Sequence, residues 1–273
     1  MSKKHKDGLE ELYDEKYEEL TREEFNEALE EEKSSPQKKK NKKKKRWSIR
    51  LVAFILAGML IFQMAAMLFE TFTVDAMRFL QTSYRLSQDD SVQEWKESVV
   101  TVQAEGPEGS SKGTGFVIDE DGYILTNHHV IEDTKTIGVN FGGGDVLEGK
   151  LQKSDKEKDL ALIQIEREEL KPLHFSEETP QAEEHIYVIG NPLSFTKIAN
   201  EGRTLTAEQT EEDALGISAP IYRGNSGSPV LNENGETVGV VYAKKTTSSS
   251  EQTTIGMAVP LSEIKSFLQE ENR

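Results

Sequence analysis

The chain has 273 residues and a formal net charge of −16, and it contains no cysteine. The acidic balance argues against nucleic acid as the main partner, and the absence of cysteine excludes disulfide frameworks and thiolate metal sites. The charge is unevenly spread, since residues 1–32 carry a net charge of −8 and residues 33–50 carry +10. These two segments and the remainder of the chain therefore need separate physical explanations.

The first segment is acidic and has leucines and tyrosines at helical spacing between residues 9 and 20. This spacing is typical of an amphipathic helix, whereas the composition is also typical of a solvated, disordered tail. We interpret residues 1–50 as a cytoplasmic tail that consists of an acidic helix or disordered segment and then a polybasic run. Its role stays open between solvation of the tail and docking of a partner.

An uncharged, apolar run follows, with the sequence LVAFILAGMLIFQMAAMLF over residues 51–69. Nineteen residues in a helix span roughly 28 Å, which is close to the hydrocarbon thickness of a bilayer. Only Gln63 in this run is strongly polar. The pattern predicts one transmembrane helix rather than a buried core helix.

The basic run KKKNKKKKRW directly precedes this apolar segment and sets its expected orientation. The positive-inside rule places the N-terminus in the cytoplasm and residues 70–273 outside the cell membrane. A nucleic-acid patch and a cleavable signal peptide are the alternatives, but some fifty residues before the apolar run favour an uncleaved, single-pass signal anchor. We interpret residues 70–95 as a stalk, or as a helix that packs on the following domain.

Short β-branched runs separated by turn signals begin after Trp95. Many short strands at such spacing indicate an all-β sandwich or barrel over residues 96–273. The final segment, LSEIKSFLQEENR, places Ile264, Phe267 and Leu268 on one face and predicts a closing C-terminal helix. The eight predicted strands are VVTVQA, TGFVID, YILTN, TIGVNF, LALIQI, IYVIG, TVGVVYA and IGMAVP.

Three polar stretches lie at the ends of predicted strands: His128 and His129 in GYILTNHHVI, Asp159 before LALIQI, and Ser226 in GNSGS. Each has a plainer interpretation, as a surface or metal-binding histidine, a solvated acid at a strand edge, or a turn serine. In the order His, Asp, Ser they also supply the base, the orienting carboxylate and the nucleophile of acyl transfer.

The glycine before the serine adds a further element of this chemistry. Gly224 allows the backbone to turn so that the N–H groups of Gly224 and Ser226 converge and form an oxyanion hole. The stretch does not fit the G-x-S-x-G elbow of α/β-hydrolases, because Ser228 replaces the last glycine and no strand-to-helix pattern surrounds it. The β-rich setting instead favours a chymotrypsin-like double β-barrel.

Five ordered motifs resemble those of trypsin-like serine proteases of the HtrA/Deg type, namely GTGFVIDEDGYILTNHHVI, DLALIQI, VIGNPL, GNSGSPVLNENGETVGVVYA and IGMAVP. The resemblance implies a catalytic triad of His129, Asp159 and Ser226, with His128 in a variable position. It implies a structural or surface role for His174 and His185. It also implies protein or peptide substrates, a role in protein quality control, and no cofactor or metal. Whether the chain forms homo-oligomers stays open.

Two departures from the HtrA pattern limit this inference. Ser228 stands where GNSGGP is usual, and too few residues follow MAVP for a PDZ domain, so peptide-sensing regulation is not expected. GNSGSPV is also similar to the glutamyl endopeptidases, but VGVVYA lacks the histidine on which their acidic specificity depends.

By resemblance to the fold, four residues are expected to line the substrate pocket and to favour a small or medium apolar residue before the cut. They are Ile221, Tyr222, Val240 and Ala243. The sequence therefore predicts a membrane-anchored serine endopeptidase, with a protease-fold binding or sensor protein of latent activity as the alternative.

Overall fold

The structure is a computed structural model. The residues that it describes are 21–34, 47, 50–63, 74–107, 109–193, 195–210, 214–246 and 254–270. The chain divides into two compact units, Met1–Thr73 and Val74–Arg273.

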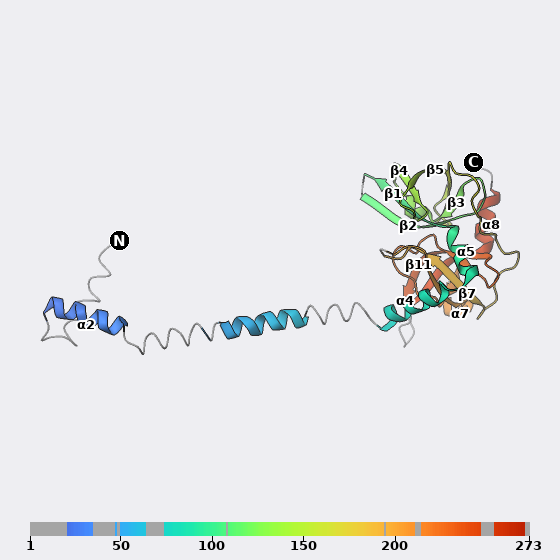
Figure 1. Ribbon diagram of the computed structural model, residues 1–273. Helices are drawn as coiled ribbons and strands as arrows, with labels where there is room; N and C mark the ends of the chain where they lie inside the picture. The colour runs from blue at the N-terminus through green and yellow to red at the C-terminus, as the bar shows by residue number, and fades with distance from the viewer. Residues whose placement is uncertain are drawn as a thin grey trace. The chain divides into compact units, whose positions relative to one another are not determined.

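The first unit contains helix α2 (Arg22–Ser34) and a helix over residues 50–63 (Figure 1). Thr21 precedes α2, and its backbone N–H donates to the Glu24 carboxylate over 2.8 Å, as in a capping box. The predicted tyrosine and leucine pattern before residue 21 lies outside the described residues.

Within the described part of the chain, no helix has both the length and the apolar character needed to cross a membrane. Residues 64–69 of the predicted span lie outside the described residues. The large apolar side chains over residues 51–62 are exposed, and Phe54 reaches 78% exposure.

In the second unit, the first six strands form a closed antiparallel barrel in the order β1-β2-β3-β6-β5-β4 (Figure 1). Its interior is filled by aliphatic side chains, among which Val102, Ile124 and Ile163 are completely buried. The strands are β1 (Val99–Gly106), β2 (Gly109–Val117), β3 (Tyr123–Thr126), β4 (Thr136–Asn140), β5 (Val146–Asp155) and β6 (Leu160–Ile165).

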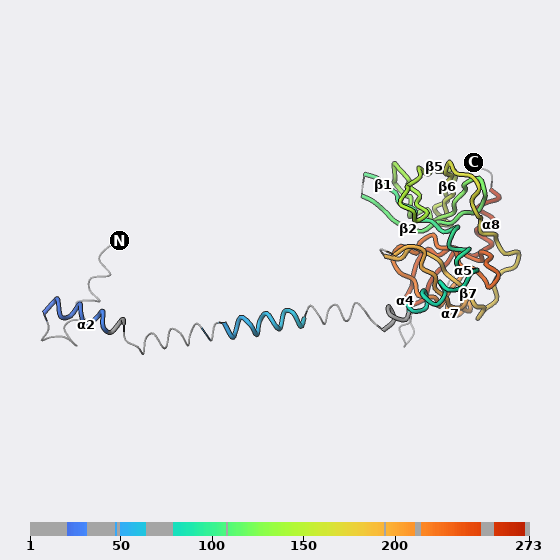
Figure 2. The backbone as a smooth tube through the Cα atoms, viewed as in Figure 1, coloured from blue at the N-terminus to red at the C-terminus, as the bar shows by residue number. Residues whose placement is uncertain are grey.

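The other six strands form a second sheet in the order β8-β7-β10-β11-β12-β9. An isolated antiparallel bridge between Thr204 and Ile217 joins the end that follows β8 to β9, so this sheet also curls towards closure. The tube in Figure 2 follows the chain from the green first barrel to the orange and red second one. The strands are β7 (His185–Gly190), β8 (Ile198–Arg203), β9 (Leu215–Ile217), β10 (Pro229–Leu231), β11 (Thr237–Thr246) and β12 (Thr254–Pro260).

The C-terminal helix predicted from the sequence is present as α8 (Leu261–Gln269). It buries Ile264 and Phe267 completely, in a core cluster that includes residues of both barrels. The Lys153 ammonium, on β5, donates to the carbonyl oxygens of Phe267 and Glu270 at the C-terminal end of this helix. Cations are favoured at this end of a helix, where carbonyl groups lack intrahelical partners.

Helices α4 (Val74–Leu86) and α5 (Asp90–Glu97) belong to the same compact unit as the barrels. Asp89 caps α5 by accepting the Ser91 backbone N–H over 2.9 Å. Leu86 and Val92 are buried in the core cluster of the domain. From Phe79 onward, the segment interpreted as a stalk or packing helix therefore packs on the domain, since Phe79 and Leu86 are both buried.

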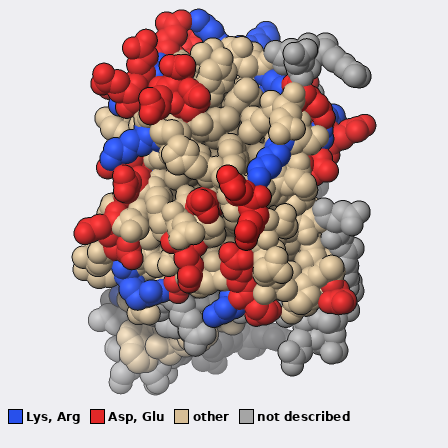
Figure 3. Space-filling model, turned by 90° about the vertical axis from the view of Figure 1, so that its right-hand side faces the viewer, with Lys and Arg blue, Asp and Glu red and all other residues tan. Residues whose placement is uncertain are grey.

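Acidic side chains gather on the face of the molecule that Figure 3 presents, and basic side chains are scattered between them. This distribution agrees with the negative formal charge of the chain.

Candidate active site

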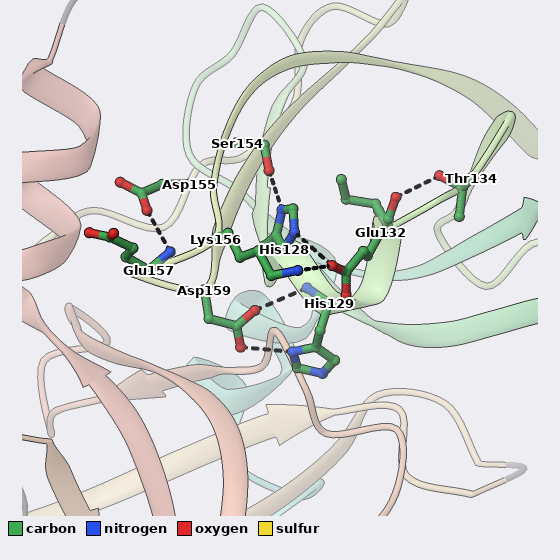
Figure 4. Close-up of polar contacts among 10 residues, drawn as sticks. His128, His129, Glu132, Thr134, Ser154, Asp155, Lys156, Glu157 and Asp159 are labelled. Atoms are coloured by element: carbon green, nitrogen blue, oxygen red, sulfur yellow. Dashed lines mark hydrogen bonds and ion pairs between the residues drawn. The ribbon is translucent and has the colours of Figure 1, made fainter.

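The first part of the candidate site is a histidine and aspartate pair at the ends of two neighbouring strands. His129 lies in the short helix α6 (His128–Ile131), directly after β3, and Asp159 immediately precedes β6. Asp159 Oδ2 lies 2.7 Å from His129 Nδ1, and Oδ1 accepts the His129 backbone N–H over 3.0 Å (Figure 4). When Nδ1 donates its proton to the carboxylate, Nε2 of the same ring is able to accept one.

The backbone around Asp159 is held in an uncommon conformation. Asp159 has a φ of 52°, in the left-handed region that Asp enters more readily than most residues. The buried Asn127 donates from Nδ2 to the Asp159 carbonyl oxygen over 2.8 Å. This bond connects the turn after β3 to the turn before β6, and so fixes the spacing between the two halves of the pair.

The neighbouring imidazole of His128 makes different contacts. Its Nδ1 hydrogen-bonds the Ser154 hydroxyl on β5, and its Nε2 lies 3.6 Å from the Glu132 carboxylate. Figure 4 shows the two rings directed towards separate partners, His129 towards Asp159 and His128 towards Ser154. The arrangement agrees with His129, and not His128, as the candidate base.

Ser226 lies in the loop before β10, so the second sheet presents it while the first barrel presents the pair. Gly224 and Gly227 on either side have φ values of +100° and +84°, which glycine adopts with least strain. Ser226 is half-buried, and in the described part of the chain no hydrogen bond joins its hydroxyl to the His129 ring.

The backbone N–H groups of this loop divide into two sets. Those of Asn225, Gly227 and Ser228 donate to the carbonyl oxygens of Tyr222, Val241 and Asn225, over 3.0, 2.8 and 2.9 Å. Those of Gly224 and Ser226 have no acceptor among the described residues. Backbone N–H groups inside a fold usually have an acceptor, and these two are the donors that the sequence predicts for an oxyanion hole.

The four predicted pocket residues occupy different surroundings. Ile221 is buried in a cluster with Ile217 and Val241, whereas Val240 packs in another core cluster, with Phe116. Adjacent strand residues point to opposite faces of a sheet, so Val241 rather than Val240 shares the side of Ile221. Tyr222 and Ala243 are both half-buried.

The two remaining histidines lie apart from the pair. The backbone carbonyl of His174 accepts the Thr237 N–H over 2.7 Å, which joins the segment between the barrels to β11. The His185 ring packs edge-on against Tyr187, with centroids 4.8 Å apart, and lies 3.5 Å from the Glu201 carboxylate. Both contacts agree with the structural or surface role expected of these residues.

Two antiparallel β units that bring a histidine–aspartate pair towards a glycine-flanked serine define the chymotrypsin-like class of fold. Residues 113–240 match the family model described as a trypsin-like peptidase domain. This part of the chain is similar to trypsin-like peptidase domains, and the relatives that it matches are named as serine proteases of the DegP and HtrA type.

A named relative is the probable periplasmic serine endoprotease DegP-like of Chlamydia trachomatis, 37% identical over 156 residues, which cover 55% of this chain and 31% of that protein. A solved serine endoprotease from Yersinia pestis has a TM-score of 0.57 and 27% identity over 66% of each chain. The active form of a protease from M. tuberculosis has a TM-score of 0.58 and 23% identity over 66% of this chain and 83% of that one. The chain spans about a third of the length of the curated relatives it matches.

Proposed function

We propose that the chain is a serine endopeptidase that hydrolyses peptide bonds of proteins outside the cytoplasmic membrane. Ser226 is the nucleophile, His129 the general base and Asp159 the residue that orients the base. The N–H groups of Gly224 and Ser226 form the oxyanion hole. The proposal is supported by the trypsin-like peptidase match and by relatives named as serine endoproteases.

The chemistry follows from this assignment of roles. Ser226 Oγ attacks the scissile carbonyl carbon while His129 Nε2 takes the hydroxyl proton, and Asp159 stabilises the resulting imidazolium. The negative charge that develops on the carbonyl oxygen is stabilised by the N–H groups of Gly224 and Ser226. The imidazolium then returns its proton to the departing amine, and water hydrolyses the acyl-enzyme by the reverse sequence of proton transfers.

One observation carries the proposal: Asp159 makes two hydrogen bonds to His129, to the ring and to the backbone N–H. A solvated acid at a strand edge would hydrogen-bond mainly to water, and would not accept two hydrogen bonds from one histidine. The test compares wild-type protein with Ser226→Ala in casein hydrolysis and in labelling by a fluorophosphonate. We expect both signals to disappear in the variant; equal labelling of the two proteins would refute the proposal.

We propose that the primary pocket is lined by Ile221, Tyr222, Val240 and Ala243, the four residues expected from the fold resemblance. Val241 is the alternative to Val240, because it belongs to the same buried cluster as Ile221. Apolar walls of this kind favour a small or medium apolar residue before the cut. A role in protein quality control is proposed from the DegP-type relatives. Proteomic identification of cleavage sites, with Ser226→Ala as the control, would test both parts.

We further propose that residues 51–69 anchor the chain in the membrane once, with the N-terminus in the cytoplasm. The absence of charge over these residues and the polybasic run before them support the anchor. The exposed apolar side chains over residues 51–62 also support it, because water solvates such a surface poorly. Carbonate extraction of membranes should leave the full chain in the pellet, and release into the supernatant would contradict the anchor.

A second candidate function is a protease-fold binding or sensor protein with a latent active site. It is favoured by one observation, namely that no hydrogen bond joins the Ser226 hydroxyl to His129 in the described part of the chain. Apo active sites often have long or poorly aligned hydrogen bonds, so this observation alone does not decide between the two. Substrate turnover by the purified wild-type protein without a partner would reject the latent form.

A further inference from the structure

Thr114, on β2 of the first barrel, is completely buried and contacts the serine loop through both its backbone and its side chain. Its backbone N–H donates to the Ser226 carbonyl oxygen over 2.8 Å. Its hydroxyl donates to the Gly224 carbonyl oxygen over 2.7 Å and accepts the backbone N–H of Asn191 over 2.9 Å. A single residue of one barrel thus bonds to the carbonyl groups on both sides of Asn225.

The remaining carbonyl groups of the loop are also occupied. Those of Tyr222, Arg223 and Asn225 accept the N–H groups of Asn225, Leu193 and Ser228, over 3.0, 2.7 and 2.9 Å. Five consecutive carbonyl groups, from residue 222 to residue 226, are therefore hydrogen-bonded. Only the bond at Gly224 comes from a side chain, which makes it the one member of the set that a point substitution can remove without altering the backbone.

The bond at Gly224 acts at a glycine, the residue type with the least restricted backbone. Glycine has the widest choice of φ and ψ, so the two peptide groups that meet at Gly224 can rotate more freely than the others. A trans peptide group is planar, so a hydrogen bond that holds the carbonyl group of one residue also fixes the direction of the N–H group of the next residue. Leu193 holds the peptide group before Gly224, and the Thr114 hydroxyl holds the one after it.

We propose that the Thr114 hydroxyl is a positioning group for the oxyanion hole. It holds the peptide group after Gly224, while Leu193 holds the peptide group that carries the Gly224 N–H, and the two bonds together fix the φ and ψ of Gly224 and keep its N–H directed at the reacting carbonyl oxygen. The inference rests on the proposed endopeptidase function. The Thr114 hydroxyl touches neither the substrate nor the reacting atoms. Its effect is therefore confined to the transition state, in which the oxygen becomes negatively charged and depends most on the N–H donors.

The test uses the full-length protein in detergent and compares Thr114→Val, which keeps the β-branched shape, with Thr114→Ser, which keeps the hydroxyl. For a peptide amide substrate, we expect Thr114→Val to lower kcat by about 10- to 100-fold with little change in KM. This is part of the loss of roughly 10²- to 10³-fold that removing an oxyanion donor outright causes. Thr114→Ser should restore kcat to near the wild-type value.

A second readout separates positioning from general damage to the fold. A peptide aldehyde forms a tetrahedral adduct with the serine, and its oxygen needs the oxyanion hole, whereas a peptide carboxylate product does not. Thr114→Val should lower the affinity for the aldehyde by about the same factor as it lowers kcat, and it should leave inhibition by the carboxylate product unchanged. If Thr114→Val does not fold, Thr114→Cys replaces it, and kcat and aldehyde affinity should both fall from Ser to Cys, because a thiol is a weaker donor.

The outcomes distinguish the two proposals. A wild-type protein that neither cleaves substrate nor reacts with a fluorophosphonate refutes the endopeptidase function. An active wild type with a Thr114→Val variant of equal kcat and equal aldehyde affinity refutes only the role of Thr114. A loss confined to KM, or equal values for the Ser and Cys variants, also refutes that role.

Discussion

The Phe79 ring of helix α4 lies edge-on against the Tyr222 ring, with the two centroids 4.8 Å apart and the ring planes at 64°. Phe79 is only 7% exposed, and Tyr222 directly precedes the Arg223–Gly224 peptide of the serine loop. Helix α4, which follows the apolar segment in the sequence, therefore packs against a residue that leads into the serine loop.

Phe79→Ala should therefore impair both stability and catalysis. Removal of a buried aromatic ring costs about 3 kcal/mol, and Tyr222 loses the surface against which it packs. We expect a lower unfolding midpoint and a several-fold lower kcat/KM for peptide substrates. Leu80→Ala is the matched control, since Leu80 is 40% exposed and its loss should change the free energy of unfolding by no more than about 0.5 kcal/mol. Equal behaviour of the two variants would contradict the supporting role.

A fragment that begins at Val74 should fold, whereas one that begins at residue 96 should not. The shorter fragment lacks Leu86 and Val92, which are buried in the core cluster with Phe116 and Phe267. Loss of each buried side chain lowers the free energy of unfolding by about 2 kcal/mol. The sum is a large part of the free energy of unfolding of a typical domain. Circular dichroism and thermal unfolding of the two fragments check this, and a cooperative transition in the shorter one would show that α4 and α5 are dispensable.

Asp159→Asn should lower kcat by roughly 10³- to 10⁴-fold with little effect on stability, because an amide no longer fixes the His129 tautomer with Nε2 as the acceptor. Ser154→Ala is the control, since it removes a hydrogen bond from the neighbouring His128 instead. Steady-state kinetics on one peptide substrate compare the two variants. A similar loss of kcat in both would mean that the two imidazoles are not functionally separate.

Gly227→Ala should be destabilising by about 3 kcal/mol. An added Cβ would lie 1.9 Å from the Thr114 carbonyl oxygen, and the φ of +84° is strained for alanine. Gly143→Ala is the control, because no atom lies within 4 Å of its Cβ position. Urea unfolding followed by tryptophan fluorescence measures both changes, and a neutral Gly227→Ala would show that the two barrels can move apart at this point.

The Glu270 carboxylate should contribute stability that depends on pH. Its hydrogen bond from Lys158, over 2.5 Å, and a weaker one from Ser266 lower its pKa from the ordinary value of 4.5. The stabilisation is therefore present above pH 4.5 and is lost as the pH falls through the lowered pKa. Glu270→Gln should lower the unfolding midpoint at pH 7 and should lower it less at pH 3. A constant difference between these pH values would contradict the ion pair.

The eight predicted strands all appear in the structure, because each is a short apolar run bounded by turn residues. Four others were not predicted. In β5, charged residues occupy positions exposed on the barrel surface, and its burial pattern never shows a fully buried residue. Strands β9 and β10 have only three residues each, too few for an alternating pattern to be recognised, and β8 contains the turn-like sequence Asn-Glu-Gly.

The site was partly accessible from the sequence for a similar reason. His129, Asp159 and Ser226 carry recognisable chemistry at strand ends, and the glycines beside the serine indicate a special backbone conformation. Thr114 carries no such signal, since a threonine in a strand is typical of β propensity alone. Its importance depends on which carbonyl groups it meets 110 residues later in the chain, and only the packing of the two barrels determines that.

The contact between Lys153 and the end of α8 has a consequence for the order in which the molecule is completed. Lys153 belongs to the first barrel, and the carbonyl oxygens that it binds lie 114 and 117 residues further along. Ribosomes extend a chain from its N-terminus, so the first barrel is synthesised with its histidine and aspartate before the serine loop and α8 exist. Under the proposed assignment, a nascent chain therefore carries His129 and Asp159 before Ser226 has been synthesised, so we expect it to have no proteolytic activity during its own synthesis.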